Sequence, residues 1–307
     1  MLKPNLKKYI ADFLKKCRGS NKKPLLVLLG PTASGKTALS LKIAGEFNCE
    51  IISADSRQIY KYMDIGTDKV LAPDRKGIPH YLIDIAEPSE RFTVADFKRL
   101  AEEKIEDILS HRKIPFIVGG TGLYIDVLTK NFSLPPENKK LRAELEAELK
   151  KYGKKYLHEK LKKLDPENAA KIHPNNARYV IRAIEIFMAT NAAKNDKRAE
   201  PKYEILQFGL NWPKEKLFER IELRVDEQLK RGLIEETKHL LGMGYDKALP
   251  SMTSFGYKEI IKYLDRELTL LEATELLKKN TRDYAKRQIT WFKRDKNIIW
   301  LNAQEIF

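Results

Sequence analysis

The sequence predicts an α/β protein whose parallel sheet core is interrupted by an inserted all-helical subdomain. Short apolar runs alternate with helical patterns in the first part of the chain, which is typical of a parallel sheet. A glycine-containing loop, Gly30–Thr37, connects the first such run to a helix. After Phe132 the pattern changes, and helical periodicity without a convincing strand continues to Ile205.

These patterns define two expected domains. Strands are expected at 25–29, 50–54, 81–85, 115–118, 205–210 and 298–301, and helices of the core at 36–47, 93–110, 213–241, 254–264 and 269–294. The insert is expected to contain helices at 138–152, 156–164, 166–172 and 176–190, followed by a polar stretch at 191–202. We therefore expect a P-loop α/β core of residues 1–131 and 204–307, and an inserted helical subdomain of residues 132–203.

The composition favours a folded chain with a polyanionic partner. The 307 residues are 42% hydrophobic and 33% charged, which is enough for one sizeable core and a smaller unit. Lys and Arg exceed Asp and Glu by 58 to 43, and the formal net charge is +15. Such a positive surface attracts nucleic acid, although Lys-rich helix faces also serve solubility alone.

Neither a membrane span nor a disulfide framework is expected. No apolar run approaches the roughly 18–20 residues that cross a bilayer, and residues 1–23 carry charges throughout. Cys17 and Cys49 lack the paired spacing of a zinc site, so we expect two free thiols and no structural metal. These features favour a cytoplasmic protein without a membrane partner.

The loop Gly30-Pro-Thr-Ala-Ser-Gly-Lys-Thr37 matches the G-x-x-x-x-G-K-[ST] pattern of ATP-binding and other nucleotide-binding proteins. Its expected phosphate-binding residues are Gly30, Thr32, Ala33, Ser34, Gly35, Lys36 and Thr37. Backbone amides surround the phosphate, Lys36 reaches its terminal oxygens, and the Thr37 hydroxyl can bind Mg²⁺. The loop predicts a P-loop NTPase-like core, but kinase, ATPase and pyrophosphate-releasing transferase chemistry all stay open.

A metal-binding acid at the end of a later strand would favour an NTPase. The run Tyr81-Leu-Ile-Asp84 ends in such a candidate. Asp84 could equally cap a turn before Pro88, and no arginine-bearing lid is evident in the sequence. The kinase interpretation therefore stays open without further support.

Asp55 directly follows the second expected strand and therefore lies beside the phosphate loop in a doubly wound sheet. It belongs to the segment Ile52-Ser-Ala-Asp-Ser-Arg-Gln-Ile-Tyr-Lys-Tyr-Met-Asp-Ile-Gly-Thr67. Further motifs follow in order: Gly119-Gly-Thr-Gly-Leu-Tyr124, His173-Pro-Asn175, Arg182-Ala-Ile-Glu185, Gly256-Tyr257 and Lys286-Arg-Gln-Ile-Thr-Trp291. Together with the phosphate loop, these motifs resemble the tRNA dimethylallyltransferase family across residues 25–301.

The resemblance implies prenyl transfer to RNA. In that family the dimethylallyl group of dimethylallyl diphosphate moves to N6 of the adenosine on the 3′ side of the anticodon (tRNA position 37), and diphosphate leaves. The resemblance implies that the phosphate loop and Mg²⁺ stabilise this diphosphate, and that Asp55 is the general base for the N6 proton. It also implies that Thr121 bonds the diphosphate ester oxygen and that Arg224 is a further diphosphate ligand.

The same side chains also have structural interpretations. A strand-end Asp can cap a turn, Thr121 can cap the helix that starts at Gly122, and a helix-surface arginine such as Arg224 is commonly solvated or paired with Glu. The resemblance alone implies the tRNA contacts, which are Asp55, Ser56, Arg57, Gln58, Thr121, Arg142, Arg178, Arg182, Gly256, Tyr257, Lys258, Lys286, Arg287, Gln288, Trp291 and Lys293. Trp291 is also expected to pack in the core.

Two departures from the family pattern affect these expectations. The segment Thr253-Ser-Phe255 has no charge where relatives carry a basic residue before the Gly-Tyr pair. No Cys/His zinc-binding extension follows the core, which favours a bacterial-type or organellar enzyme.

Three alternatives stay open beside the tRNA-modifying interpretation. They are an adenylate isopentenyltransferase with a free nucleotide as acceptor, a P-loop kinase of small molecules or nucleotides, and a non-catalytic RNA-binding GTPase-like module. The long insert and the basic C-terminal helix favour a tRNA anticodon stem-loop as the partner. A monomer is expected because one core and its insert can hold one tRNA arm.

Overall fold

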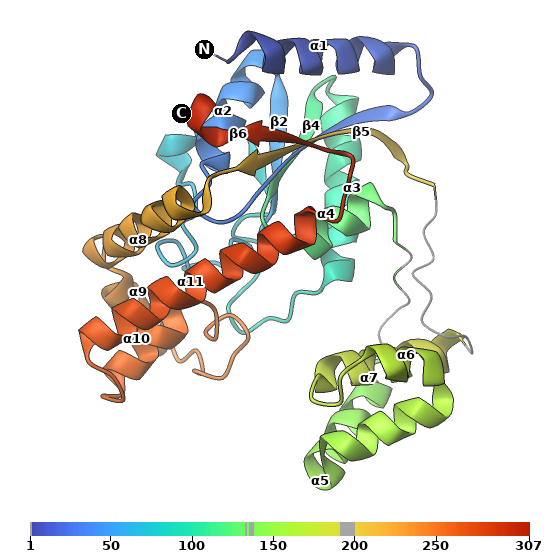
Figure 1. Ribbon diagram of the computed structural model, residues 1–307, viewed down its shortest axis with the longest axis vertical. Coiled ribbons are helices and arrows are strands. Elements are labelled where there is room, and N and C mark those ends of the chain that lie inside the picture. Colours follow the sequence, from blue (N-terminus) through green and yellow to red (C-terminus); the bar gives the residue numbers. More distant parts are fainter. Residues whose placement is uncertain (1, 133, 135–137, 191–199) are drawn as a thin grey trace. The chain divides into compact units, whose positions relative to one another are not determined.

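The computed structural model describes residues 2–132, 134, 138–190 and 200–307. The chain forms two compact units, one of residues Met1–Thr129 and Pro201–Phe307 and one of residues Lys130–Glu200 (Figure 1). The first unit contains the phosphate loop, and the regular structure of the second, within its described residues, consists of helices. No helix among the described residues is long and apolar enough to span a membrane.

A six-stranded sheet with strand order β3-β2-β4-β1-β5-β6 forms the centre of the larger unit, and every strand pair in it is parallel. The strands are β1 (Lys23–Leu29), β2 (Cys49–Ala54), β3 (His80–Tyr81), β4 (Ile114–Gly119), β5 (Tyr203–Asn211) and β6 (Ile298–Asn302). Because β1 lies between β4 and β5 and is covered on both faces, its run Leu25–Leu29 is apolar throughout. The predicted α/β fold with a parallel sheet is confirmed.

The first four helices of the larger unit are α1 (Pro4–Arg18), α2 (Lys36–Phe47), α3 (Val94–Ser110) and α4 (Gly122–Thr129), and a short 3-10 turn spans Ala72–Arg75. Helices α1 and α2 share an apolar core with the sheet that includes Ile10, Leu39 and Phe116. Helix α3 contacts β2, β4 and α4, and its Phe97 stacks on Tyr124 with 4.1 Å between the ring centroids. The sheet is thus covered by helices, as a parallel sheet requires.

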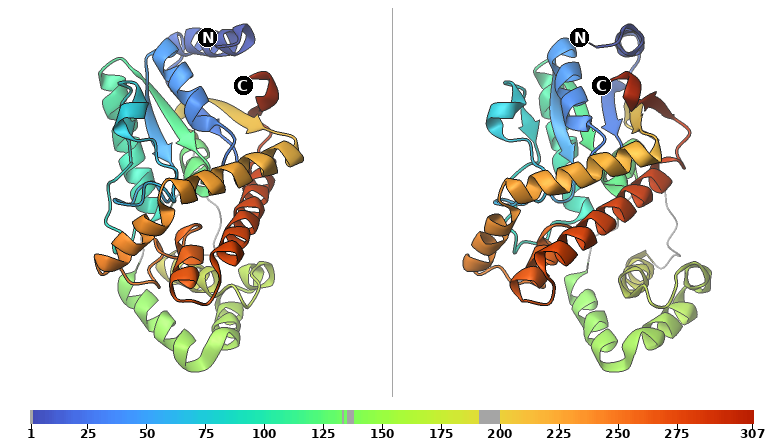
Figure 2. Two further views of the ribbon diagram at one scale, coloured as in Figure 1. Left: turned by 90° about the vertical axis from the view of Figure 1, so that its left-hand side faces the viewer. Right: turned by 60° about the vertical axis from the view of Figure 1, so that its left-hand side comes forward.

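The later helices of this unit are α8 (Lys214–Lys230), α9 (Leu233–Gly242), α10 (Tyr257–Leu264) and α11 (Leu270–Phe292), and a 3-10 turn at Ala303–Glu305 follows β6. Helices α8 and α11 lie side by side (Figures 1 and 2). The sequence predicts one helix over 213–241, but the structure has two. Gly232 adopts a φ of 99°, a left-handed conformation that ends α8 before α9 begins.

The expected strand at 81–85 is wrong beyond its first residue. Strand β3 ends at Tyr81 because Leu82 and Asp84 have φ values of 60° and 57°, which no strand accommodates. The chain turns there toward the segment after β2, and the amide of Asp84 donates to the carbonyl of Gln58. This turn brings the 82–86 segment beside the 58–61 segment.

The smaller unit consists of α5 (Lys139–Leu164), α6 (Pro166–Lys171) and α7 (Ala177–Thr190). Leu145, Leu157, Leu161, Val180 and Ile184 form its own apolar core. Gly153 has non-helical dihedrals (φ 83°, ψ 176°) inside α5 and divides it where the sequence predicts two helices. Most of the expected polar stretch at 191–202 lies outside the described residues.

Candidate active site

The phosphate loop joins the buried end of β1 to the first turn of α2. Gly30, Ala33 and Gly35 have φ values of 154°, 60° and 91°, so the loop turns sharply twice before the helix. A side chain at Gly30 would meet the carbonyl of Leu210 at 3.3 Å, which explains glycine at this position. The first amides of α2 have no helical acceptor and therefore suit an anion.

Two side chains of the β5–α8 region hold the loop from outside. Trp212 Nε1 donates to the carbonyl of Ser34 at 3.0 Å, and Arg220 Nε donates to the carbonyl of Ala33 at 2.9 Å. The Arg220 guanidinium also lies 4.6 Å from the centroid of the Trp212 ring. With these carbonyls engaged, the loop keeps a shape that can bind phosphate before any ligand arrives.

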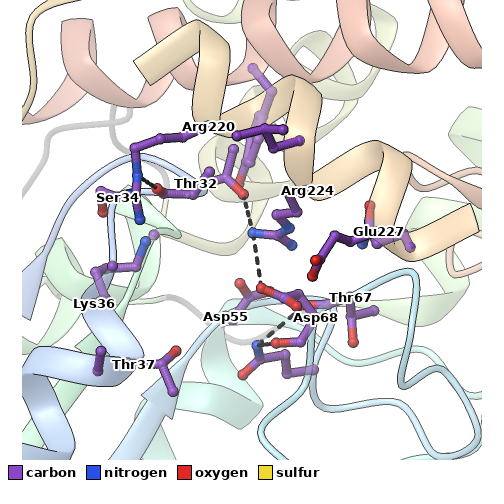
Figure 3. Close-up of a pocket in the computed structure, with 18 of the residues that line it drawn as sticks. Thr32, Ser34, Lys36, Thr37, Asp55, Thr67, Asp68, Arg220, Arg224 and Glu227 are labelled. Carbon is purple, nitrogen blue, oxygen red and sulfur yellow. Dashed lines mark hydrogen bonds and ion pairs between the residues drawn. The ribbon is translucent and has the colours of Figure 1, made fainter. Parts of the chain in front are cut away.

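A cavity of about 440 Å³ opens in front of the loop. It is bounded by the loop itself, by the segments after β2 and β4, and by side chains of α8 and α11 (Figure 3). The predicted residues that line it are Thr32, Ala33, Ser34, Gly35, Lys36, Thr37, Asp55, Gln58, Arg224 and Gln288. The structure therefore brings the phosphate loop and the strand-end acid Asp55 to one cavity.

Lys36 and Arg224 provide positive charge at this cavity. Lys36 Nζ donates to the carbonyls of Pro31 and Gly30 at 2.7 and 3.1 Å. Burial lowers the pKa of its ammonium to about 8, with Asp55 opposing the shift and Arg224 adding to it. Arg224 donates to Thr32 Oγ1 at 2.7 Å and lies 3.4 Å from a carboxylate oxygen of Asp68. An arriving anion would meet two cations already in place.

Asp55 and Thr121 follow neighbouring strand ends. Ala54 and Gly119 are paired in the β2–β4 register, and a side chain at Gly119 would lie 2.2 Å from the carbonyl of Ala54. The amide of Thr121 donates to that carbonyl at 3.1 Å, and Thr121 Oγ1 accepts from the amide of Ser56 at 3.0 Å. Asp55 Oδ1 accepts from the amide of Arg57 at 2.9 Å, which leaves its other oxygen for a ligand.

The other residues after β2 are partly used inside the protein. Gln58 accepts from Ser53 Oγ at 3.1 Å and donates to the carbonyls of Thr67 and Asp68, both at 3.3 Å. Arg57 donates to the carbonyl of Pro250 at 2.8 Å. These bonds fix the segment that carries Asp55 relative to the next loop.

Helix α11 supplies both buried and exposed predicted residues. Gln288 is buried; its Oε1 accepts from the amide of Thr32 at 2.9 Å, and its Nε2 donates to the carbonyl of Gly120 at 2.8 Å. It bridges the two strand-end loops and is placed to position them. Lys286, Arg287 and Lys293 are exposed.

Trp291 also lies on α11 and is 37% exposed. Its Nε1 donates to Asp126 at 3.0 Å, and a side chain at Gly122 would meet its ring at 2.4 Å. The ring therefore packs partly on α4 and presents the remainder to solvent.

Tyr257, an expected tRNA contact, lies inside the protein. Its side chain is completely buried, packs against Gly66 and donates to Glu236 Oε1 at 2.6 Å, which gives it a structural role, and the tRNA contact stays a prediction. Burial, followed by the charge of Glu236, raises its pKa well above the usual value. Gly256, with a φ of 95°, is the N-cap of α10, and Lys258 is partly exposed above the Phe255 ring.

Within the smaller unit, Arg142 and Arg182 both approach the buried carboxylate of Glu185, at 3.4 and 3.3 Å from its Oε2. Arg142 also pairs with Glu146 at 3.1 Å. Arg178 is exposed on the first turn of α7. Arg142 and Arg182 therefore also stabilise this unit, while Arg178 faces solvent.

Asp84 does not line the cavity. Its carboxylate pairs with the buried ammonium of Lys69, which also binds Asp64 and the carbonyl of Tyr60. The structure thus gives Asp84 a structural partner. Within the described residues no cluster of three or more His, Cys, Asp or Glu side chains could hold a metal ion alone.

Sequence reasoning missed several residues of the site, among them Asp68, Trp212, Arg220 and Tyr284. Asp68 pairs with Arg224 and Arg231, and Tyr284 lines the cavity near Asp55 and Thr121. Asp68 directly follows the motif that ends at Thr67, and Arg220 lies one helical turn before Arg224, so both positions could have been found from the sequence. Trp212 directly follows β5, which pairs with β1, so it lies beside the loop by the same strand-end rule as Asp55. Tyr284 carries no local signal, because only the packing of α11 brings it to the cavity.

The fold and this cavity define a P-loop protein that binds a phosphorylated ligand beside a strand-end acid. The family model described as IPP transferase matches residues 58–295, and the chain belongs to this family. It is 49% identical over 287 residues to the tRNA dimethylallyltransferase of Alkaliphilus oremlandii, with 92% of each chain covered.

Solved structures agree with this membership. The tRNA isopentenylpyrophosphate transferase of Bacillus halodurans is 44% identical, with a TM-score of 0.69 and coverage of 92% of this chain and 90% of that chain. A eukaryotic dimethylallyltransferase solved acting on tRNA is 31% identical, with a TM-score of 0.80 and coverage of 92% and 74%. The resemblance found in the motifs is confirmed at the level of the family.

Proposed function

We propose that this protein transfers the dimethylallyl group of dimethylallyl diphosphate to N6 of the tRNA adenosine on the 3′ side of the anticodon. The observation that carries the proposal is that Asp55 and the phosphate loop line the same cavity. A phosphate loop alone fits many reactions, and an acid beside it fits a reaction in which a proton is removed as the phosphate leaves. Membership of the IPP transferase family supports this assignment.

The chemical step follows from the position of these groups. The N6 lone pair forms a bond to C1 of the donor, and the bond between C1 and the diphosphate oxygen breaks with its electron pair on diphosphate. The Asp55 carboxylate accepts the N6 proton, so N6 stays neutral in the product. Thr121 holds the amide of Ser56 and thereby fixes the segment of Asp55, and we also assign its hydroxyl to the bridging ester oxygen.

Lys36, Arg224 and the amides of residues 33–37 stabilise the negative charge that grows on the leaving diphosphate. The Thr37 hydroxyl and the carboxylates of Asp68 and Glu227 provide oxygen donors at the cavity, which suit Mg²⁺. Mg²⁺ bound there would neutralise further diphosphate charge. In this proposal the Thr37 hydroxyl coordinates the Mg²⁺ ion directly.

The acceptor base must leave the stack of the anticodon loop to reach the cavity. Lys286, Arg287 and Lys293 are exposed on α11 and are suited to phosphate contacts, and the exposed part of Trp291 lies on the same helix. We assign the smaller unit, through Arg178 and the partly engaged Arg142 and Arg182, to the tRNA arm. We further propose that the protein acts as a monomer. We also propose that it acts in the cytoplasm, because its two cysteines are free thiols, as is usual in a reducing compartment.

The test is mass spectrometry of unmodified tRNA incubated with the protein, Mg²⁺ and dimethylallyl diphosphate. AMP is present as a competing acceptor, and Asp55→Asn is the matched control. We expect one dimethylallyl mass on the adenosine beside the anticodon and its loss in the variant. Prenylation of AMP alone would instead assign the protein to nucleotide prenylation, and no product on either acceptor would contradict the proposal.

A further inference from the structure

Tyr284 has no role in the reaction as described so far. Its side chain comes from the middle of α11 and lines the cavity beside Asp55. Among the described residues that line this cavity, it is the one aromatic side chain. The charged residues of the lining are the cations Lys36, Arg220, Arg224 and Arg231 and the anions Asp55, Asp68 and Glu227.

The contacts of α11 place this ring between the two halves of the site. Gln288, one helical turn further along the same face, bonds the amide of Thr32 in the phosphate loop. Tyr284 itself lies within hydrogen-bonding reach of the Thr121 hydroxyl and close to the Asp55 carboxylate. The ring therefore lines the cavity close to Asp55 and Thr121, one helical turn from the residue that bonds the phosphate loop.

Neighbouring side chains fix the orientation of the ring. Phe255 packs against it at a centroid distance of 5.2 Å and an interplanar angle of 42°. The Arg287 guanidinium lies 5.8 Å from its centroid. Because both partners and the Thr121 contact restrain it, the ring offers a fixed surface to the cavity.

The donor creates a need for such a surface. As the C1–oxygen bond breaks, positive charge spreads over the allylic carbons of the dimethylallyl group, and the nearby Lys36 and Arg224 cannot stabilise it. An aromatic face attracts a cation through its quadrupole and also packs against an apolar chain.

We propose that the ring of Tyr284 is the wall against which the dimethylallyl group lies, and that its aromatic face stabilises the charge on the allylic carbons during transfer. The inference rests on the proposed function and adds a residue that acts on the transferred group. The reaction balance is unchanged: the electron pair of the C1–oxygen bond leaves with diphosphate, and the N6 proton passes to Asp55.

The first test compares Tyr284→Phe with Tyr284→Leu in single-turnover reactions at saturating tRNA and donor. Phenylalanine keeps the ring and loses only the hydroxyl, so the rate should stay within about threefold of the wild type. Leucine keeps an apolar side chain but loses the aromatic face and part of the volume, so the rate should fall about tenfold to thirtyfold. The KM for tRNA should be unchanged in both variants.

The second test separates charge stabilisation from shape. Phenylalanine derivatives with one, two and three ring fluorines are incorporated at position 284, which weakens the aromatic face at nearly constant size. The logarithm of the single-turnover rate should fall stepwise with each fluorine. A flat series, or a leucine variant altered only in the KM for tRNA, would overturn the proposal and favour packing or stacking on the target base.

A negative result for Tyr284 can be distinguished from failure of the proposed function. The wild-type protein must first give the prenylated tRNA with this donor, and all variants are expressed relative to that rate. If the wild type makes product and the fluorinated series is flat, only the role of Tyr284 is excluded. Thermal unfolding midpoints of the variants identify any that fold poorly, and the fluorinated series does not depend on the leucine variant.

Discussion

The guanidinium of Arg224 donates a hydrogen bond of 2.7 Å to Oγ1 of Thr32, and so links α8 directly to the phosphate loop. The same guanidinium lies 3.4 Å from Asp68, which holds it at the cavity in the absence of a ligand. A preformed cation at the leaving-group position contributes to catalysis because no reorganisation is needed as charge develops.

Replacing Arg224 by lysine should therefore weaken donor use. Lysine keeps the charge but has no planar group to bond Thr32 and a phosphate oxygen together. We expect kcat/KM for the donor to fall about thirtyfold, which corresponds to a loss of about 2 kcal/mol of transition-state stabilisation. The KM for tRNA should change little. Arg99→Lys, at an exposed pair with Glu103, is the control. An unaltered donor kcat/KM in Arg224→Lys would show that Arg224 does not bind the donor.

The pH dependence of donor use should report Lys36. Burial lowers its pKa from 10.5 to about 8, so the free protein loses this charge as the pH rises through about 8. Because kcat/KM reflects the free enzyme, its value for the donor should fall above that pH. The profile is measured from pH 6 to about 10 in the wild type and in Lys36→Arg, whose guanidinium stays charged. The same descending limb in both proteins would assign it to another group.

Replacing Gln288 should weaken donor binding more than tRNA binding. Gln288→Leu removes the bonds to Thr32 and Gly120 and leaves a buried amide and carbonyl unpaired, which costs about 1–3 kcal/mol. We expect a higher KM for the donor in steady-state kinetics. Arg287→Gln, the exposed neighbour, should instead raise the KM for tRNA, most strongly at low salt. If Gln288→Leu changed only the KM for tRNA, the side chain would be an RNA ligand after all.

Glu236 should matter for stability. Its carboxylate accepts from the amides of Asp64, Ile65 and Gly66 at 2.9, 2.8 and 3.0 Å. Glu236→Gln places an amide group among these donors, so the free energy of unfolding should fall by about 2–4 kcal/mol. Urea denaturation measures it, with Glu235→Gln as the control because Glu235 is exposed on the same helix turn. Equal stability of the two variants would mean that these bonds contribute little.

The sequence predicts those elements and site residues whose positions follow from local sequence patterns. The glycine pattern of Gly30–Thr37 places the strand, loop and helix, and Asp55 is found beside the loop because parallel strands end at one edge. The sequence patterns do not predict helix α1, although Leu6, Ile10 and Cys17 have a helical spacing and are buried in the structure. Helix α8 ends earlier than predicted because a single glycine, Gly232, takes a left-handed conformation.

Residues placed by tertiary packing could not be found in this way. Tyr257 belongs to a recognised motif, but only the structure shows that it is buried against Gly66. Tyr284 reaches the site because α8 and α11 lie together next to the strand-end loops. No periodicity or spacing rule specifies that contact, so its place in the site appears only with the fold.

We propose that the phosphate loop binds a carbon-linked diphosphate rather than a nucleoside triphosphate. The most direct measurement follows diphosphate release and tRNA prenylation in one reaction, with ATP turnover followed in a parallel sample. We predict one diphosphate released for each dimethylallyl group on tRNA, and no ATP turnover. Hydrolysis of ATP without prenylated tRNA would contradict the account and assign the loop to an NTP-using enzyme.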